Sequence, residues 1–287
     1  MKNLLVGQSG GPTAVINASL YGVVKAALAS PEIDHVYGMV NGIEGMLQDH
    51  TIDLGESLSE TELELLKLTP AAYLGSCRYK LPESLTDAFY ETIFDKFHRM
   101  EIGYFLYIGG NDSMDTVSKL SRYAAHHGSD IRFIGIPKTI DNDLVLTDHT
   151  PGYGSAAKYV AASVREIALD ASVYQQKAVT IVELMGRHAG WLTAASALAR
   201  KFEGDNPALI YLPEADFDQE SFLASLEECF KTKNNLIVCV SEGIHDKDGT
   251  FICEYASEVG TDNFGHKMLT GSGKYLENLV KEKLGVK

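Results

Sequence analysis

The stretch YFLYIGGNDSMDTVSKLSRYAAHHG, residues 104–128, decides the fold that the sequence predicts. An apolar run ends in two glycines, and a helical pattern then continues from residue 113 to a glycine stop at Gly128. A strand, a glycine turn and a helix in this order form one unit of an α/β protein. The chain repeats the same order of elements on either side of this stretch.

Other apolar runs predict strands, and other helical patterns follow most of them. The expected strands cover residues 3–7, 35–40, 131–137, 177–184, 207–213 and 235–243, and the expected helices cover 12–30, 152–172, 189–202 and 218–232. Continuous apolar strands that alternate with helices indicate parallel sheets with helices on both faces. We therefore expect an α/β protein whose second lobe begins near the helical pattern at 152–172.

The composition limits the classes of function. With 287 residues, 45% of them hydrophobic, the chain can bury the core of one large domain or two ordinary ones. A formal charge of −14 argues against binding to nucleic acid or to an anionic membrane. The four cysteines lack metal-ligand spacing, and no apolar run approaches the length of a membrane span. We expect a soluble cytoplasmic protein with buried free thiols.

Ligands of open α/β sheets bind beyond the carboxyl ends of the strands, where four loops carry unusual residues. These loops cover residues 7–13, 109–114, 137–143 and 241–243. In GQSGGPTAVINA (7–18), Gly10 and Gly11 let backbone amides approach an anion at a helix start. The loop lacks the G-K-[ST] ending of a Walker A loop and lacks a G-x-G-x-x-G fingerprint. A tight strand-to-helix turn is therefore an equal alternative to a phosphate site.

Two further loops offer oxygen atoms and a cation. In GGNDS (109–113), Asn111 and Asp112 are suited to a metal ion or, equally, to capping the helix. In PKTIDND (137–143), Asp141 and Asp143 alternate along an extended segment, so one suits a base and the other a metal. Lys138 places a positive charge there, although an ordinary polar turn is also typical of such a sequence.

Three more segments complete the inventory. LGSCRYK (74–80) carries Arg78, a side chain suited to bidentate phosphate contact, and SEG (241–243) places Glu242 at a strand end. ELMGRHAGW (183–191) carries Arg187 and His188, of which the histidine is more typical of a helix start or a core. Backbone amides, cations, a metal-capable pair and a carboxylate base together indicate phosphoryl transfer.

The order SGGPTAVINA, LGSCR, GGNDS, PKTIDND, VELMGR, VSEG resembles the phosphofructokinases over essentially the whole chain. The resemblance implies that residues 1–138 bind the phosphoryl donor and residues 139–287 bind the sugar phosphate, with Mg²⁺ as cofactor. It implies that Asp141 is the base toward the 1-hydroxyl of fructose 6-phosphate. It also implies that Thr139 lies beside Asp141 and that Asp143 supports the metal and phosphates. The other implied roles are donor contacts by Gly11 and Arg78, metal binding by Asn111, and sugar-phosphate binding by Met185, Gly186, Arg187 and Glu242.

Two positions bear on the identity of the donor. ATP-using members of the family typically carry glycine where this chain has Asp112 and Lys138, and the pyrophosphate-using branch is similar to this chain at both. An aspartate adds bulk and like charge where the α-phosphate of ATP must pass. A lysine stabilises the departing phosphate. We expect a pyrophosphate-dependent enzyme; ATP dependence is the nearest alternative, and a noncatalytic subunit is another.

The resemblance also implies features beyond these motifs. Family members continue past the last helix with a further strand and a sugar-phosphate contact, and this chain ends at KYLENLVKEKLGVK before any such motif. We therefore expect that a C-terminal segment is missing, which leaves an inactive fragment as a further alternative. The shared active sites of the family imply a homo-oligomer, either a dimer or a tetramer.

Overall fold

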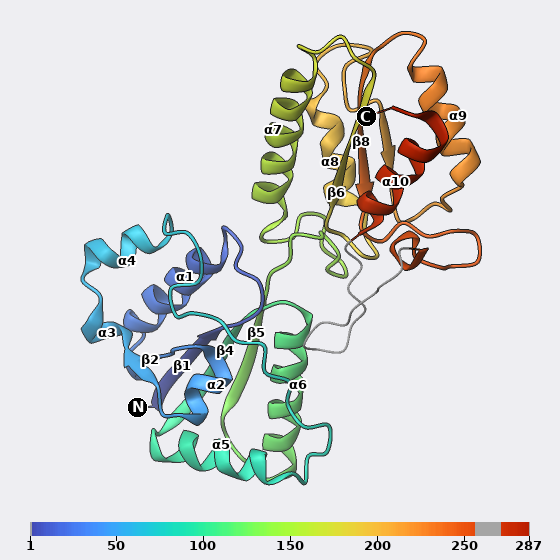
Figure 1. The fold of residues 1–287 in the computed structure, drawn as a ribbon. Helices are drawn as coiled ribbons and strands as arrows, with labels where there is room; N and C mark the ends of the chain where they lie inside the picture. Colours follow the sequence, from blue (N-terminus) through green and yellow to red (C-terminus); the bar gives the residue numbers. More distant parts are fainter. Residues whose placement is uncertain (1, 256–270, 287) are drawn as a thin grey trace. The chain divides into compact units, whose positions relative to one another are not determined.

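The computed structural model describes residues 2–255 and 271–286 of the chain (Figure 1). The chain divides into two compact units, Met1–Thr139 and Ile140–Lys287. This division falls one residue after the boundary that the resemblance implies, and before the helical pattern at 152–172 where the sequence pattern places the start of the second lobe. Both units are α/β, with helices packed on the two faces of a sheet, as the sequence predicts.

Unit 1 is built on a five-stranded sheet with the order β3-β2-β1-β4-β5. Its strands are β1 (Lys2–Gln8), β2 (Ile33–Met39), β3 (Thr51–Asp53), β4 (Ile102–Gly109) and β5 (Arg132–Pro137). Neighbouring strands are parallel except β3, which runs antiparallel to β2 at the sheet edge. The sequence pattern did not predict β3, because three residues are too few to form an apolar run.

Helices cover both faces of this sheet (Figure 1). One face packs against α1 (Ile16–Leu28), α3 (Leu54–Ser57) and α4 (Glu60–Leu66), and the other against α2 (Gly42–Leu47), α5 (Ala88–Arg99) and α6 (Asn111–His126). Side chains alternate along β1. Leu4 and Val6 therefore lie in the apolar cluster on the face of α1, α3 and α4, and Leu5 lies in the cluster on the opposite face. This two-sided burial explains why the strand reads as a continuous apolar run.

Unit 2 is built on three parallel strands with the order β6-β8-β7. They are β6 (Ala178–Leu184), β7 (Leu209–Tyr211) and β8 (Asn235–Ser241). One face packs against α9 (Gln219–Cys229) and α10 (Ser272–Leu284), and the other against α7 (Tyr153–Ala171), α8 (Trp191–Ala195) and the 3₁₀ helix η1 (Ser196–Ala199). The single helix expected at 189–202 is therefore two short pieces. A second 3₁₀ helix, η2 (Ile252–Tyr255), follows β8.

Side-chain caps fix the starts of several helices. Ser59 and Glu62 form a capping box at α4, in which each side chain bonds the other residue's backbone amide. Asp87 caps α5 by accepting from the amide of Phe89, and Asp218 caps α9. The apolar faces of these helices then pack against the sheets, which supplies most of their stability.

The composition also leads us to expect buried free thiols and no membrane-spanning segment. All four cysteines are free; Cys77, Cys239 and Cys253 are buried, and Cys229 is half-buried. Within residues 2–255 and 271–286, the helices all lack the length and apolar character needed to cross a bilayer.

Candidate functional site

The carboxyl ends of β1, β4 and β5 meet at one edge of the unit 1 sheet. Gln8 pairs with Ile108, and Gly109 pairs with Pro137, so the loops that follow these strands begin side by side. The first loop turns at Gly10, whose φ of 76° lies in the left-handed region that favours glycine. The Gly10 amide donates to the carbonyl of Cys77 at 3.4 Å, and its own carbonyl accepts from Ser76 Oγ at 2.6 Å.

Lys138 is buried at the end of β5, with 5% of the residue exposed. Its backbone amide donates to the carbonyl of Gly109 at 3.0 Å. Its Nζ lies 3.9 Å from the position that a Cβ atom on Gly10 would take. The structure therefore brings the Lys138 amine against the loop of residues 7–13, which we call the glycine-rich loop. Three of the four loops that the sequence indicates (7–13, 109–114 and 137–143) meet at this edge of the sheet.

Gly11 differs from Gly10 in its surroundings. Its backbone lies outside the left-handed region. No atom of residues 2–255 and 271–286 lies within 4 Å of the position that a Cβ atom on Gly11 would take, so this part of the fold has room for a side chain there. The residue is exposed. A glycine that the fold does not require is suited to the close approach of a ligand to the backbone.

Asn111 and Asp112 are the first residues of α6, and both are exposed. Gly110 is the N-cap residue, and the helix has no side-chain capping bond. The alternative that Asn111 or Asp112 caps this helix is therefore wrong. Their amide and carboxylate oxygens remain at the surface, at the start of a 16-residue helix whose dipole favours anions.

Arg78 is exposed and lies in the irregular segment between α4 and α5. The two residues before it are held to the glycine-rich loop by the bonds of Gly10 described above. Ser9 Oγ adds a third bond, to the carbonyl of Cys77 at 3.3 Å. The backbone next to Arg78 thus lies beside Gly10. The Lys138 amine also lies against Gly10, so the glycine-rich loop is in contact with both.

In unit 2, the PKTIDND segment turns at Asn142. This residue is buried and has a φ of 59°, so Asp141 and Asp143 flank a left-handed residue. The expected extended alternation of the two aspartates is wrong at this point. Asn142 Oδ1 accepts from the amide of Thr150 at 2.8 Å, and its Nδ2 donates to the carbonyl of Asp148 at 3.2 Å.

These two bonds close the loop 142–150 around one side chain. Asp141 is half-buried and Asp143 is exposed. Asn142 is not among the candidate residues that the sequence motifs indicate. An asparagine between two aspartates is nevertheless a turn signal, since asparagine tolerates the left-handed conformation and bonds to nearby backbone.

The ends of β6 and β8 meet at the MGR and SEG segments. The Gly186 amide donates to Glu242 Oε1 at 3.2 Å, and the Gly186 carbonyl accepts from Ser241 Oγ at 2.6 Å. A Cβ on Gly243 would lie 1.9 Å from the Arg187 carbonyl, so the two segments touch through backbone. Met185 beside them is 58% exposed.

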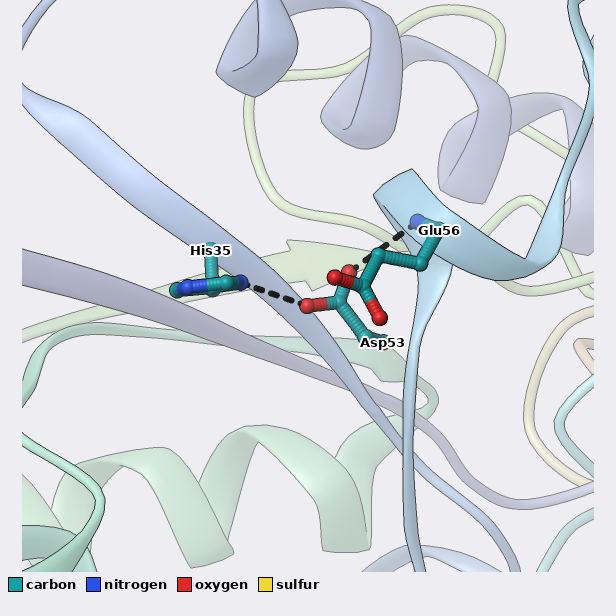
Figure 2. A group of neighbouring side chains, drawn as sticks. All are labelled: His35, Asp53 and Glu56. Carbon is teal, nitrogen blue, oxygen red and sulfur yellow. Dashed lines mark hydrogen bonds and ion pairs between the residues drawn. The ribbon is translucent and has the colours of Figure 1, made fainter.

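A separate group of side chains in unit 1 has the spacing of metal ligands: His35, Asp53 and Glu56 (Figure 2). His35 Nδ1 lies 2.6 Å from Asp53 Oδ2. Asp53 Oδ1 accepts from the amides of Gly55 and Glu56 and so caps α3. Because both oxygens of Asp53 already have partners, we assign the group to a structural ion pair and helix cap.

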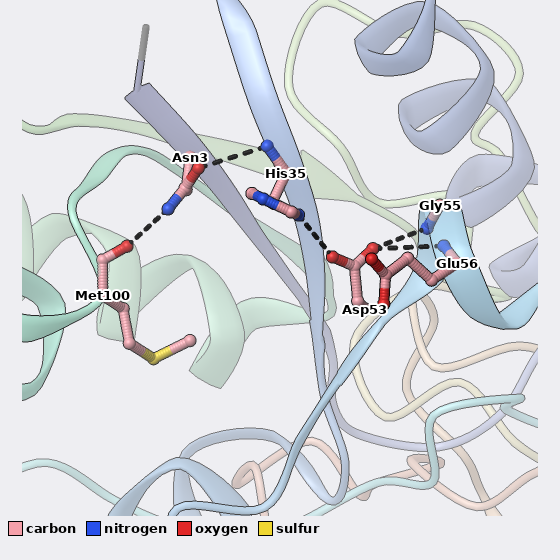
Figure 3. Close-up of polar contacts among 6 residues, drawn as sticks. All are labelled: Asn3, His35, Asp53, Gly55, Glu56 and Met100. Atoms are coloured by element: carbon pink, nitrogen blue, oxygen red, sulfur yellow. Dashed lines mark hydrogen bonds and ion pairs between the residues drawn. The ribbon is translucent and has the colours of Figure 1, made fainter.

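This group lies away from the loops described above. His35 is near the start of β2, whereas those loops follow the carboxyl ends of β1, β4 and β5. The backbone amide of His35 donates to Asn3 Oδ1 at 3.1 Å, and Asn3 Nδ2 donates to the Met100 carbonyl at 2.7 Å (Figure 3). The hydrogen bond to Asp53 raises the pKa of His35 above 6.5.

Comparisons with known proteins bear on the chemistry of these loops. A family model described as "Phosphofructokinase" matches residues 3–287. A protein of Rhodospirillum rubrum named pyrophosphate--fructose 6-phosphate 1-phosphotransferase is 45% identical over 99% of this chain and 70% of its own length. A protein of Glaesserella parasuis named ATP-dependent 6-phosphofructokinase is 31% identical over 100% of this chain and 84% of its own length.

A solved structure gives the same result. The crystal structure of a pyrophosphate-dependent phosphofructokinase from Marinobacter aquaeolei matches with a TM-score of 0.83 and 40% sequence identity. The match covers 100% of this chain and 67% of that one. The resemblance carried by the sequence motifs is therefore confirmed at the level of both sequence and fold.

Proposed function

The chain belongs to the phosphofructokinase family, and from this premise we propose that it transfers a phosphoryl group reversibly between pyrophosphate and fructose 6-phosphate. The relative at 45% identity that carries this name supports the reaction. The observation that carries the choice of donor is the buried Lys138 amine against the glycine-rich loop.

Unit 1 supplies the donor-binding residues in this proposal. The exposed backbone at Gly11 receives phosphate oxygens, and Arg78 contributes bidentate contacts. Lys138 is held by its surroundings before the donor binds, so its charge stabilises the departing phosphate with little reorganisation. Asp112 makes the start of α6 unfavourable for the α-phosphate of ATP, through both its bulk and its charge.

Unit 2 supplies the base and the sugar-phosphate residues. Asp141 accepts the proton of the 1-hydroxyl of fructose 6-phosphate as that oxygen attacks the phosphorus atom. Thr139 lies two residues before it, and Asp143 supports the phosphates. Glu242 accepts hydrogen bonds from sugar hydroxyls while it also bonds the amide of Gly186, and Arg187 with Met185 completes the sugar-phosphate contacts.

Mg²⁺ is the cofactor that the family implies, and the residues of this chain fit it. Mg²⁺ takes oxygen ligands, and it commonly uses one or two carboxylates together with substrate phosphates and waters. Asn111 and Asp112 present exposed amide and carboxylate oxygens at the start of α6, and Asp143 is an exposed carboxylate. We assign Asn111 to the metal. When bound, the ion neutralises charge on the donor phosphates.

Location and assembly also enter the proposal. The protein acts in the cytoplasm, as expected of a family of glycolytic enzymes. It forms a homo-oligomer, a dimer or a tetramer, and unit 2 offers exposed apolar side chains that support association. They lie on and after α7 and on η1, and they are Tyr159, Leu169, Val173, Tyr174 and Leu198.

An assay of fructose 1,6-bisphosphate formation tests the donor. With Mg²⁺ present, we expect turnover with pyrophosphate to exceed turnover with ATP by about 100-fold or more. Equal or better use of ATP would sink the proposal, and the protein would then be an ATP-dependent 6-phosphofructokinase. The double variant Asp112→Gly, Lys138→Gly should lose pyrophosphate activity and gain ATP binding.

Calorimetry on the same chain separates a catalytic from a noncatalytic protein. We expect pyrophosphate with Mg²⁺ to bind, and the variant Arg78→Ala to bind it more weakly. Binding of both substrates without turnover would contradict catalysis by this chain and would indicate an inactive fragment or a noncatalytic subunit. Asp141→Ala should keep pyrophosphate binding and lose turnover, and near-parent turnover would refute its role as the base.

A further inference from the structure

The segment that carries Arg78 has no regular secondary structure of its own. It runs from the end of α4 to the start of α5, across residues 67–87. A connection of this length inside a compact unit is uncommon and is usually functional. Its backbone conformation must therefore be fixed by contacts with other elements.

Gln8, the last residue of β1, supplies one set of these contacts. It is fully buried. Its Oε1 accepts from the amide of Leu74 at 2.9 Å, and its Nε2 donates to the carbonyl of Ile16 at 3.1 Å and to Asn17 Oδ1 at 2.9 Å. One side chain thus joins the strand before the glycine-rich loop, the helix after it, and the Arg78 segment.

Asn17, the second residue of α1, supplies the other set and is also fully buried. Its Nδ2 donates to the carbonyls of Thr69 and Ala71 at 2.9 and 2.8 Å. Its Oδ1 accepts from the amide of Tyr73 at 2.9 Å and from Gln8. Both amide side chains therefore have partners at their oxygen and at their nitrogen, and together they bind four residues of the segment.

The bonds continue to the residue before Arg78. Ser76 Oγ donates to the Gly10 carbonyl, and the Gly10 amide and Ser9 Oγ both donate to the Cys77 carbonyl. A chain of buried or half-buried hydrogen bonds thus runs from residue 69 to residue 77, along the glycine-rich loop. A network in which every member has a partner holds one backbone arrangement and resists others.

We propose that Gln8 and Asn17 are positioning residues for the pyrophosphate site: they fix the backbone of residues 69–77 and thereby hold Arg78 beside Gly10 and Gly11. Both side chains are fully buried, so this role does not require either of them to contact the donor. The proposal rests on the donor role assigned above to Arg78 and Gly11. It adds that the affinity for pyrophosphate depends on two buried amides in the strand and helix that flank the glycine-rich loop.

The variant Asn17→Asp tests this with a change of one atom. It keeps Oδ1 for Tyr73 and Gln8, and it replaces the Nδ2 donor by an oxygen that faces the carbonyls of Thr69 and Ala71. We expect the KM for pyrophosphate to rise about tenfold, because two bonds are lost. We expect the KM for fructose 6-phosphate to stay near its parent value.

Asn3→Asp is the matched control (Figure 3). Asn3 is a buried asparagine in β1. The variant keeps Oδ1, which accepts from the amide of His35, and loses the Nδ2 donor to the carbonyl of Met100. It lies at the opposite end of the strand from the Arg78 segment. We expect this variant to lower the Tm and to leave both KM values unchanged. An equal rise of the pyrophosphate KM in both variants would overturn the proposal.

A double-mutant cycle separates positioning from general damage. If Asn17 acts through Arg78, the substitution Asn17→Asp should change the pyrophosphate KM little when Arg78→Ala is already present. Additive effects would refute positioning while leaving the donor role of Arg78 intact. If Arg78→Ala alone leaves the pyrophosphate KM unchanged, the donor role fails first and the inference falls with it.

Hydrogen exchange supplies a readout that does not depend on activity. The amides of Tyr73 and Leu74 should exchange faster in Asn17→Asp than in Asn3→Asp. Equal exchange in the two variants would overturn the proposal. Should Asn17→Asp fail to fold, Ser76→Ala is the second variant, because it removes only the half-buried side-chain bond to the Gly10 carbonyl. A pyrophosphate KM raised about threefold in Ser76→Ala supports positioning. An unchanged pyrophosphate KM refutes it.

Discussion

The carboxylate of Glu242 accepts a hydrogen bond from the backbone amide of Gly186 at 3.2 Å, which joins the ends of β8 and β6. The residues of the SEG and MGR segments are 56 positions apart in the chain and become neighbours through this contact. One side chain therefore serves both the backbone at the strand ends and the proposed sugar-phosphate site. A change at Glu242 should affect substrate binding more than folding.

Glu242→Gln should raise the KM for fructose 6-phosphate by about 10- to 100-fold, because a charged acceptor of sugar hydroxyls is lost. The KM for pyrophosphate should change much less. Steady-state kinetics with each substrate varied in turn measures both values. Glu183→Gln is a suitable control, since Glu183 on β6 accepts from the amides of Gly271 and Gly273 and so holds the start of α10. It should lower the Tm and leave the KM unchanged; equal kinetics for the two variants would contradict the role of Glu242.

Lys138→Met should lower kcat with pyrophosphate by about 10²- to 10³-fold, the usual effect of removing a preorganised charge from a developing anion. The measurement is the rate at saturating substrates. Lys96→Met is the matched control, because Lys96 is a buried lysine of the same unit that lies on α5 and bonds Asp49 at 2.5 Å. A kcat loss of similar size in the control would show that the effect is structural.

Gly10→Ala and Gly11→Ala should separate folding from binding at adjacent positions. The first places a Cβ on a left-handed residue and should destabilise the protein by about 1–2 kcal/mol in urea unfolding. The second places a Cβ with no atom of the described residues within 4 Å, so its unfolding free energy should change by less than about 0.5 kcal/mol. Its pyrophosphate KM should nevertheless rise about tenfold. An unchanged KM in Gly11→Ala would remove Gly11 from the donor site.

His35→Gln should change the pH dependence of stability and leave activity unchanged. The hydrogen bond to Asp53 raises the folded-state pKa of His35 above 6.5, so protonated His35 stabilises the fold. This contribution is fully present below the unfolded pKa and is lost as the pH rises through the folded pKa. The Tm difference between parent and variant should therefore be largest below about pH 6.5 and should shrink at higher pH. A difference that grows with pH would contradict the ion pair, and His50→Gln, at an exposed position of the same unit, serves as the control.

The main strands could be predicted from the sequence because their apolar runs are buried on both faces. Strand β8 is an example, since six of its seven residues are buried. Strand β3 and the short helices α2 and α3 could not, because elements of three to six residues carry too little periodic signal. The expected helix 189–202 is divided into α8 and η1, and both pieces pack against residues of β8.

The residues of the candidate site also fall into those that the sequence indicates and those that only the structure shows. Glycine and charged residues in loops after strands are visible in the sequence, and they indicate Lys138 and Gly11 as candidates. The sequence does not indicate Gln8 and Asn17, because the groups that they bind in the Arg78 segment are backbone groups more than 50 positions away, in a segment without a pattern of its own. The left-handed turn at Asn142 depends likewise on bonds to Asp148 and Thr150.

The amide network around Arg78 consists of asparagine, glutamine, serine and backbone groups, none of which titrates in the range where proteins are usually studied. The anchoring of this segment should therefore be insensitive to acid and only weakly sensitive to salt. The cap of α3 is different, because its cap residue Asp53 pairs with the ionisable His35. A pH profile of the pyrophosphate KM would then report the ionisation of the donor itself and of the charged groups that contact it, undistorted by movement of the loop that presents Arg78.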